Sequence, residues 1–303
     1  MNNNLYSSVY RNLEREFIYL SNLIHINDEQ IKIYSIKITE LLIRTVVEVE
    51  SIIKELYFLN EGTKTDDKDL FFDTDCFGHL ESKWKLSKKL IFVSSPNLYF
   101  DKEENKIINP LYKANKRGSS SSDWLQAYQA VKHNRGKNLK KGNLKHLIRA
   151  LGGLYILNIY YKDTTFNLEN DGTATNFDTS LGSELFSVKL HNSRSISTKE
   201  ILTKRKDFEE CIYLIKATDK SREDIINAFN DINNSAQEKF NREIIKIPKF
   251  ENGNIDEYHK TLKDTIIKLK KTSEKQATKE NGLKLKQSLE NNKYEAILNK
   301  HQF

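Results

Sequence analysis

The feature that most constrains the fold is one apolar segment, residues 144–161, which would be apolar on nearly every face of a helix. A helix that is apolar all round must be buried on all sides. We therefore expect it to be the central helix of a helical domain, with Gly152 and Gly153 letting a neighbouring helix approach closely. Lys145, His146 and Arg149 interrupt the run, which is too short to span a bilayer.

Helical spacing recurs along the chain, which holds only 3 prolines in 303 residues. We expect a first helix at 2–23 and a second at 31–60. The second helix would bury an apolar face and expose a charged stripe with the spacing of i,i+4 ion pairs. The apolar face comprises Leu42, Val46, Val49, Ile53, Leu56 and Tyr57, and the stripe comprises Glu40, Arg44, Glu48, Ser51 and Glu55.

Short alternating segments at 90–94, 98–101 and 106–109 predict strands, with a hairpin turn at 101–106. Another short strand is expected at 184–190. Beyond residue 195 the sequence becomes rich in charge, and helices are expected at 198–206, 207–217, 221–244, 256–272 and 283–298. The expected fold is mainly α: a helical bundle (1–195) with a small β-hairpin insertion and a C-terminal helical extension (196–303).

The net charge of +7 suits binding to a polyanion, and equally suits a solubilising surface. Cys76 and Cys211 lie far apart without CxxC spacing, which argues against a zinc site and a disulfide framework. The sequence contains none of the nucleotide, zinc-protease or serine-hydrolase signatures. We expect a cytoplasmic protein with no metal, no other cofactor and no membrane partner.

The most distinctive segment is 123–135, which ends in Lys132-His133-Asn134-Arg135. On a helix, Arg135 continues the apolar stripe of Trp124, Tyr128 and Val131, with Lys132 at its edge. A cation on a buried face needs a partner, such as a carboxylate or a phosphate. We expect Arg135 to be buried against Glu48 or, second, Glu40. The alternative is a helix C-terminus whose cations interact with the helix dipole.

Two basic segments flank this helix, 113–122 and 137–142. Their cations could line a phosphate-binding groove with the aromatic residues behind, or could simply be solvated. The cations concerned are Lys116, Arg117, Lys137, Lys140 and Lys141. His146 follows at the start of the central helix, either as a site residue or as a partly exposed histidine.

The arrangement Trp-x3-Tyr-x2-Val-Lys-His-x-Arg, followed by a basic turn and a long apolar helix, resembles bacterial and prophage-borne proteins with a HEPN-like helical core. The resemblance covers roughly residues 5–190. It implies a helical bundle that dimerises, and many such proteins are metal-independent RNases of toxin and defence systems. Their usual motif is Arg, four to six residues, then His. Here ten residues separate Arg135 from His146, while His133 precedes Arg135.

The resemblance therefore implies an RNA-directed defence or toxin-type protein, with metal-independent endoribonuclease activity as its chemistry. In such a reaction a histidine activates the 2′-hydroxyl and a cation stabilises the phosphorane. His133 or His146 would be the base, and Arg135 with Lys132 would hold the phosphate. Supporting roles fall to Glu48, Arg44 and Tyr128. The alternative is a non-catalytic interaction module that binds nucleic acid, a protein partner or a second copy.

Overall fold

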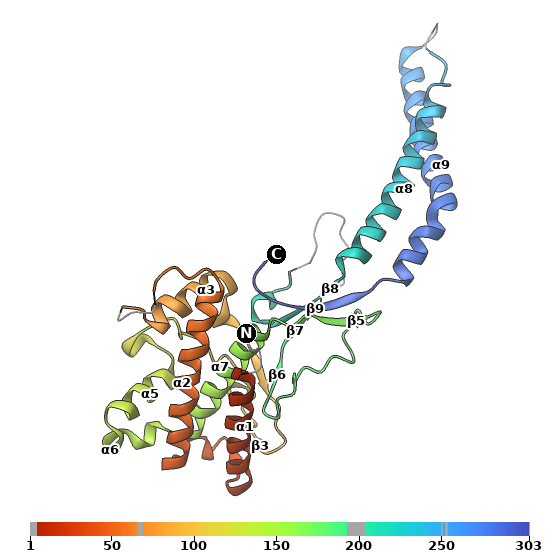
Figure 1. Ribbon diagram of the computed structural model, residues 1–303. Coiled ribbons are helices and arrows are strands. Elements are labelled where there is room, and N and C mark those ends of the chain that lie inside the picture. Colours follow the sequence, from red (N-terminus) through yellow and green to blue (C-terminus); the bar gives the residue numbers. More distant parts are fainter. Residues whose placement is uncertain (1–4, 66–68, 193–203, 250, 252–253, 303) are drawn as a thin grey trace.

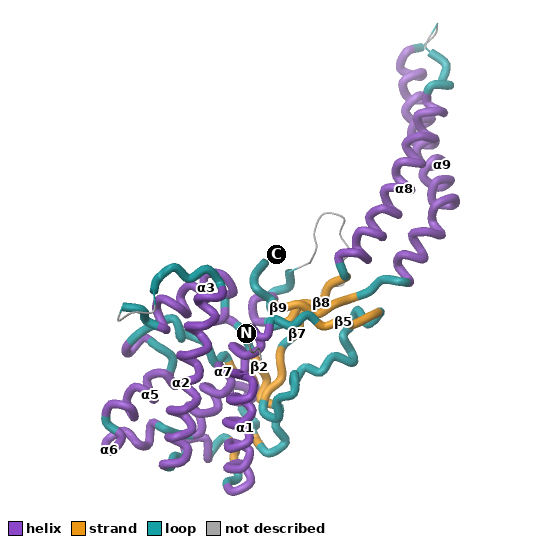
Figure 2. The backbone as a smooth tube through the Cα atoms, in the orientation of Figure 1, coloured by secondary structure: helices purple, strands orange, loops and turns teal. Residues whose placement is uncertain are grey.

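The computed structural model describes residues 5–65, 69–192, 204–249, 251 and 254–302. The described chain is mainly helical, with a compact helical body and a long two-helix arm that projects away from it (Figure 1). A four-stranded sheet lies where the body meets the arm (Figure 2). The mainly α class expected from the sequence is therefore confirmed.

The helical body is built around α7 (Leu144–Lys162). Its side chains are buried on every face, as the apolar run predicted, and Asn143 caps its first turn by accepting a hydrogen bond from the backbone N–H of His146 at 3.2 Å. The helices packed on it are α1 (Leu5–Leu23), α2 (Ile36–Leu59) and α5 (Asp123–His133).

The two glycines of α7 pack against different neighbours. A Cβ at Gly153 would lie 3.2 Å from Leu111 and 3.8 Å from Trp124 of α5, so this glycine does face another helix. A Cβ at Gly152 would instead lie 2.9 Å from the Ile91 side chain, which belongs to a strand. The expected helix contact is thus correct for Gly153 and wrong for Gly152.

Helix α2 buries the whole predicted apolar face, Leu42 through Tyr57. The predicted i,i+4 ion pairs on its other side are wrong. Arg44 instead reaches α1, where its Nη1 lies 2.7 Å from Glu16, which also binds Lys37. The carboxylate of Glu16 comes from a second helix, α1, which packs beside α2. Residue spacing within α2 alone cannot reveal such a partner.

The predicted strands exist as β2 (Ile91–Val93), β3 (Leu98–Tyr99), β4 (Ile107–Ile108) and β6 (Phe186–Val188). The hairpin between the last two segments of the insertion does not form. β3 pairs in parallel with β1 (Ile26–Asn27), whereas β4 and β6 flank β2 in an antiparallel sheet.

Hydrogen bonds to Asp28 explain this difference. The Asp28 carboxylate accepts hydrogen bonds from the backbone N–H groups of Asp101 and Lys102 and from the Asn105 side chain. These bonds hold the connection as a helical turn, α4 (Glu103–Lys106), in place of the expected hairpin turn. Asp28 therefore acts across the chain as a cap that local sequence does not show.

The C-terminal third contains strands as well as helices. β8 (Tyr213–Ala217) and β9 (Tyr294–Leu298) form within segments expected to be helical. The helix prediction is therefore wrong for 207–217, whereas that for 283–298 is correct for 283–290 and wrong beyond. They join β5 (Phe166–Glu169) and β7 (Leu190–Asn192) in the sheet order β5-β9-β8-β7. The boundary expected at 195/196 lies outside the described residues, yet strands from both sides of it share this sheet.

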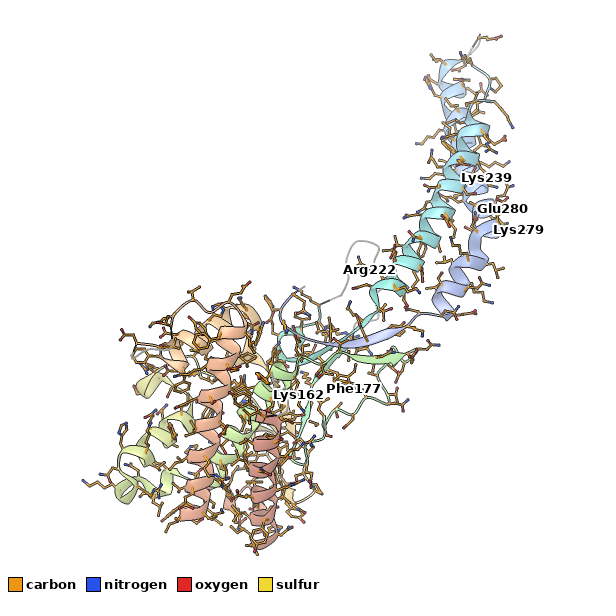
Figure 3. The ribbon with its side chains drawn as sticks, viewed as in Figure 1. Lys162, Phe177, Arg222, Lys239, Lys279 and Glu280 are labelled. Atoms are coloured by element: carbon orange, nitrogen blue, oxygen red, sulfur yellow. The ribbon has the colours of Figure 1, made fainter. Side chains whose placement is uncertain are left out.

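The arm consists of α8 (Asp219–Ile244) and α9 (Ile255–Glu290), packed along each other. α9 runs through the break that the sequence suggested between 272 and 283. A small apolar contact of Ile232, Ala236 and Ala277 joins the helices, and Lys239 pairs with Glu280 across them (Figure 3). Of the helix expected at 198–206, residues 198–203 lie outside the described residues and 204–206 are not helical.

Shorter helices complete the described chain: η1 (Gln30–Lys32), the π-helix η2 (Phe72–Phe77), α3 (Gly78–Trp84), η3 (Leu86–Lys88), η4 (Gly118–Ser120), α6 (Arg135–Asn138), η5 (Leu139–Lys141) and η6 (Phe208–Glu210). Among the described residues, no helix has the length and apolar character needed to cross a membrane.

Candidate functional site

Helix α5 ends before Arg135, earlier than the sequence predicted. Trp124, Tyr128 and Val131 are buried, as predicted, and the Trp124 indole N–H donates to the Pro110 carbonyl at 2.7 Å. The helix ends at His133 because Asn134 leaves helical geometry, at φ −150° and ψ 81°. The Asn134 side chain accepts a hydrogen bond from the Lys137 N–H and thereby caps the next helix, α6.

This break overturns the prediction for Arg135. The residue opens α6 instead of continuing the stripe of α5, and it is exposed. No ion pair joins its side chain to Glu48, to Glu40 or to any other described residue. Glu40 is exposed, and Glu48 lies with Arg44 in a shallow surface hollow of about 180 Å³ against α1.

The carboxylate that does meet the signature helix is Glu50. Tyr128 interacts electrostatically with both Glu50 and Lys132. Burial raises the pKa of Glu50, and the Tyr128 contact raises the pKa of Lys132, whose Nζ lies 5.2 Å from the Tyr128 ring centroid. Lys132 and Tyr128 thus form a polar cluster that secures α5 on α2. Glu50 follows the buried Val49, and nothing in its own spacing singles it out.

A surface groove of about 480 Å³ lies on another side of α5. Two cations and a histidine from separate segments line it: Arg117 from the loop before η4, Lys141 from η5, and His133 from the end of α5. All three were expected as site residues from the sequence. Leu125, Gln126 and Gln129 of α5 form one wall, and Phe72 and Asp73 of η2 form part of the other.

Arg117 is held in place from two directions. Its Nε donates to the Asp73 carboxylate at 3.0 Å, and its guanidinium lies 3.7 Å from the Phe71 ring centroid. The structure records no other hydrogen bond from Arg117 to the described residues, so its terminal amino groups remain for a ligand. Stacking and a single carboxylate bond orient the planar fork that suits a phosphate. Asp73 and Phe71 were missed, because contacts across 44 residues leave no local pattern.

The other predicted cations of the two basic segments do not line the groove. Lys116, Lys137 and Lys140 are exposed on the loop and on the α6–η5 segment, beside Arg135. Side chains of this kind add positive potential near an anionic ligand even without direct contact.

His146 lies at the start of α7, next to the groove-lining segment. Its Nδ1 lies 2.6 Å from the Lys141 carbonyl oxygen, and because a carbonyl only accepts, Nδ1 carries the proton. Burial lowers the pKa of this ring. Nearby, Arg149 forms an ion pair with Asp123, which closes the first turn of α5 onto α7. His146 therefore supports the backbone of Lys141 and does not line the groove.

The described residues contain no cluster of His, Cys, Asp and Glu side chains arranged to hold a metal ion. Comparison of the chain with protein-family models, curated proteins and solved structures found no match.

Proposed function

We propose that the chain binds RNA in the groove beside α5 and cleaves it there without a metal. The observation that carries this proposal is the meeting of Arg117, His133 and Lys141 in one solvent-reachable groove. Two cations and an imidazole from three segments form a site that fits a backbone phosphate. Arg117 takes the role first expected of Arg135.

The chemistry follows from the side chains present. Arg117 and Lys141 hold the phosphate oxygens and offset the charge of the phosphorane. The His133 imidazole accepts the proton of the ribose 2′-hydroxyl, whose oxygen attacks phosphorus. The bond from phosphorus to the 5′ oxygen breaks, that oxygen takes a proton from solvent, and a 2′,3′-cyclic phosphate is left.

A cleavage assay tests the catalytic part. Purified protein is incubated with total RNA or tRNA in the presence of EDTA, and products are separated on a denaturing gel. His133→Ala should abolish cleavage, whereas His259→Ala, which removes an equally exposed histidine from α9, should leave it unchanged. Loss of cleavage in both variants, or cleavage only without EDTA, contradicts the proposal.

A binding assay tests the electrostatic part. The logarithm of affinity should fall with the logarithm of salt concentration, by about 0.7 for each phosphate contact with a single strand. Replacing Lys137, Lys140 and Lys141 together with Gln should flatten this slope by about two units. Lys270→Gln, on the arm, should not change it. Salt-independent binding would remove RNA as the ligand.

A second candidate is a non-catalytic interaction module. It is favoured by one observation: within the described part of the chain, His133 is the sole histidine lining the groove, so no second imidazole is placed to protonate the leaving group. RNA binding that depends on Arg117 and Lys141, without cleavage products at any pH, would select this candidate.

A defence or toxin role, and a homodimer, are proposed on the HEPN-like resemblance of residues 5–190. Induced expression should arrest bacterial growth for the unaltered chain and not for His133→Ala. Light scattering after size-exclusion chromatography measures the oligomeric state. Growth arrest that persists in the variant would separate toxicity from the groove.

A further inference from the structure

A second cavity, separate from the groove, lies where the helical body meets the four-stranded sheet. It has a volume of about 520 Å³ and is bounded by α1, the C-terminal half of α7, β5 and the loop before β6. Lys162 and Phe177, which both line it, lie at this junction in Figure 3. The cavity is large enough for a small organic ligand.

One wall of the cavity is aromatic. Phe166, Phe177 and Tyr213 contact one another, with ring centroids 5.2–5.6 Å apart and planes inclined by 55–86°. Phe166 and Phe177 are only half-buried, so part of each ring remains accessible. A flat ring could pack against such a wall.

Asn158 supplies a polar group that lacks a partner. Its side chain is 5% exposed and lines the cavity. Its Nδ2 donates to the Leu154 carbonyl at 2.9 Å, which fixes the orientation of the amide. Its Oδ1 is buried and has no hydrogen-bond partner among the described residues. A buried acceptor without a donor is costly, and a ligand N–H or O–H would satisfy it.

The cavity also has a positive edge. Lys162 and Arg11 line it, and neither forms an ion pair with a described residue. Burial lowers the pKa of Lys162, and the nearby positive charge of Arg11 lowers it further. The one carboxylate in the lining, Asp178, is occupied by the backbone N–H and hydroxyl of Ser180, at 2.9 and 2.6 Å. The lining thus carries one net positive charge, from two cations and one anion.

The opposite wall is held rigidly. Tyr10 donates to the buried Glu14 at 2.8 Å, and Glu14 accepts from the backbone N–H groups of Glu184 and Leu185. Tyr155 donates to the Ser180 carbonyl at 2.9 Å. These bonds fix the loop on the helices, so the cavity is formed before any ligand arrives, which reduces the entropic cost of binding.

We propose that this cavity binds a mononucleotide. The base would pack on the wall of Phe166 and Phe177, a donor on the base or ribose would bond to Asn158 Oδ1, and the phosphate would lie between Lys162 and Arg11. A ligand with an aromatic ring, a hydrogen-bond donor and an anionic group matches all three features at once. The inference does not depend on RNA binding in the groove.

Isothermal titration calorimetry of the full chain with AMP, GMP, CMP and UMP tests the proposal. We expect saturable 1:1 binding of at least one of them. The matching nucleoside, which lacks the anion, and inorganic phosphate, which lacks the ring, should both bind more than tenfold more weakly. Absence of binding by all four nucleotides at millimolar concentration overturns the proposal.

Two variants locate the site. Lys162→Gln should weaken nucleotide binding about tenfold, as expected for a lost charge-assisted hydrogen bond. Asn158→Leu should weaken it about three- to tenfold while leaving the melting temperature unchanged or higher, because it removes an unsatisfied buried acceptor. The melting temperature distinguishes a binding role of Asn158 from a structural one.

Lys141→Gln, which removes a lysine that lines the groove, is the matched control and should leave nucleotide affinity unchanged. An affinity lost in Lys141→Gln and retained in Lys162→Gln would place the nucleotide in the groove and overturn the proposal. If Asn158→Leu fails to fold, the surface variant Lys162→Gln alone decides. RNA cleavage and nucleotide binding can fail separately, since each has its own variant.

Discussion

Replacing Lys89 with Met should stabilise the protein at neutral pH. Lys89 is fully buried, and its Nζ makes one hydrogen bond, at 3.2 Å to the Cys211 carbonyl. Burial lowers the pKa of Lys89 from 10.5 to about 8, against a smaller opposing effect of Glu209. The folded protein therefore holds the charged ammonium at a cost that the unfolded chain does not bear.

The magnitude follows from this difference in pKa. A fall from 10.5 to about 8 corresponds to about 3 kcal/mol of lost stability at pH 7, taken at 1.36 kcal/mol per pKa unit. Between these two pKa values the Lys89 side chain is more protonated in the unfolded chain than in the folded protein, so the free energy of unfolding rises with pH. The unaltered protein should gain about 2 kcal/mol from Lys89 between pH 7 and pH 9.5.

Met fits the site because it fills similar volume without a charge. The Cys211 carbonyl stays satisfied, since the Asn299 side chain also donates to it at 3.0 Å. Lys89→Met should thus raise the free energy of unfolding at pH 7 by about 2–3 kcal/mol, and the advantage should shrink towards pH 9.5.

Urea denaturation followed by circular dichroism at pH 7, 8, 9 and 9.5 measures this. The matched control is Lys88→Met at the exposed neighbouring position, which should change stability by less than about 0.5 kcal/mol and keep the pH dependence of the unaltered chain. A Lys89→Met variant less stable than the unaltered protein at pH 7, or a difference that does not vary with pH, would refute the reasoning.

Three further outcomes are expected. Gly153→Leu should destabilise by about 1–3 kcal/mol in a thermal melt, because even its Cβ meets Leu111 at 3.2 Å; a neutral melt would contradict the packing. Burial lowers the pKa of His146, so its stabilising contribution is complete above about pH 6.5 and is lost as pH falls through the folded value. His146→Gln should then lose less stability than the unaltered chain between pH 7.5 and pH 5 in urea titrations, and equal losses would count against burial. Arg135→Ala should change the free energy of unfolding by less than about 0.5 kcal/mol in urea titrations, because Arg135 is exposed. Loss of one partner of a buried ion pair would instead cost about 3–5 kcal/mol.

The parts of the fold that could be predicted are long helices in which the placement of apolar residues shows which faces are buried. The all-round apolar run of α7 and the one-sided apolar face of α2 each fix both the helix and its burial. Short apolar segments are ambiguous, because a run such as Tyr213–Ala217 fits a buried strand and part of a helix equally well. Pairing partners decide such cases, and those partners lie far away in the sequence.

The candidate site was predictable in its residue types and less so in its geometry. His133, Lys141 and Arg117 were expected, yet the stripe ending in Arg135 assumed that α5 continues through Asn134. Asn134 caps α6 and thereby ends α5 at His133. No proline or glycine stands at this position to mark the break in the sequence. The pairing of Arg117 with Asp73 depends on the packing of η2, which local spacing cannot show.

The arm of α8 and α9 leaves the sheet from two neighbouring antiparallel strands, with Ala217 of β8 opposite Tyr294 of β9. In topological terms the whole arm occupies the position of a hairpin loop. Its described helices pack mainly on each other, so little of the energy that holds them is shared with the body. The arm should therefore open as a cooperative unit of its own, with amide protons that exchange with solvent well before those of α7 do. A chain built in this way can lengthen, shorten or replace its arm through evolution while the body keeps its fold.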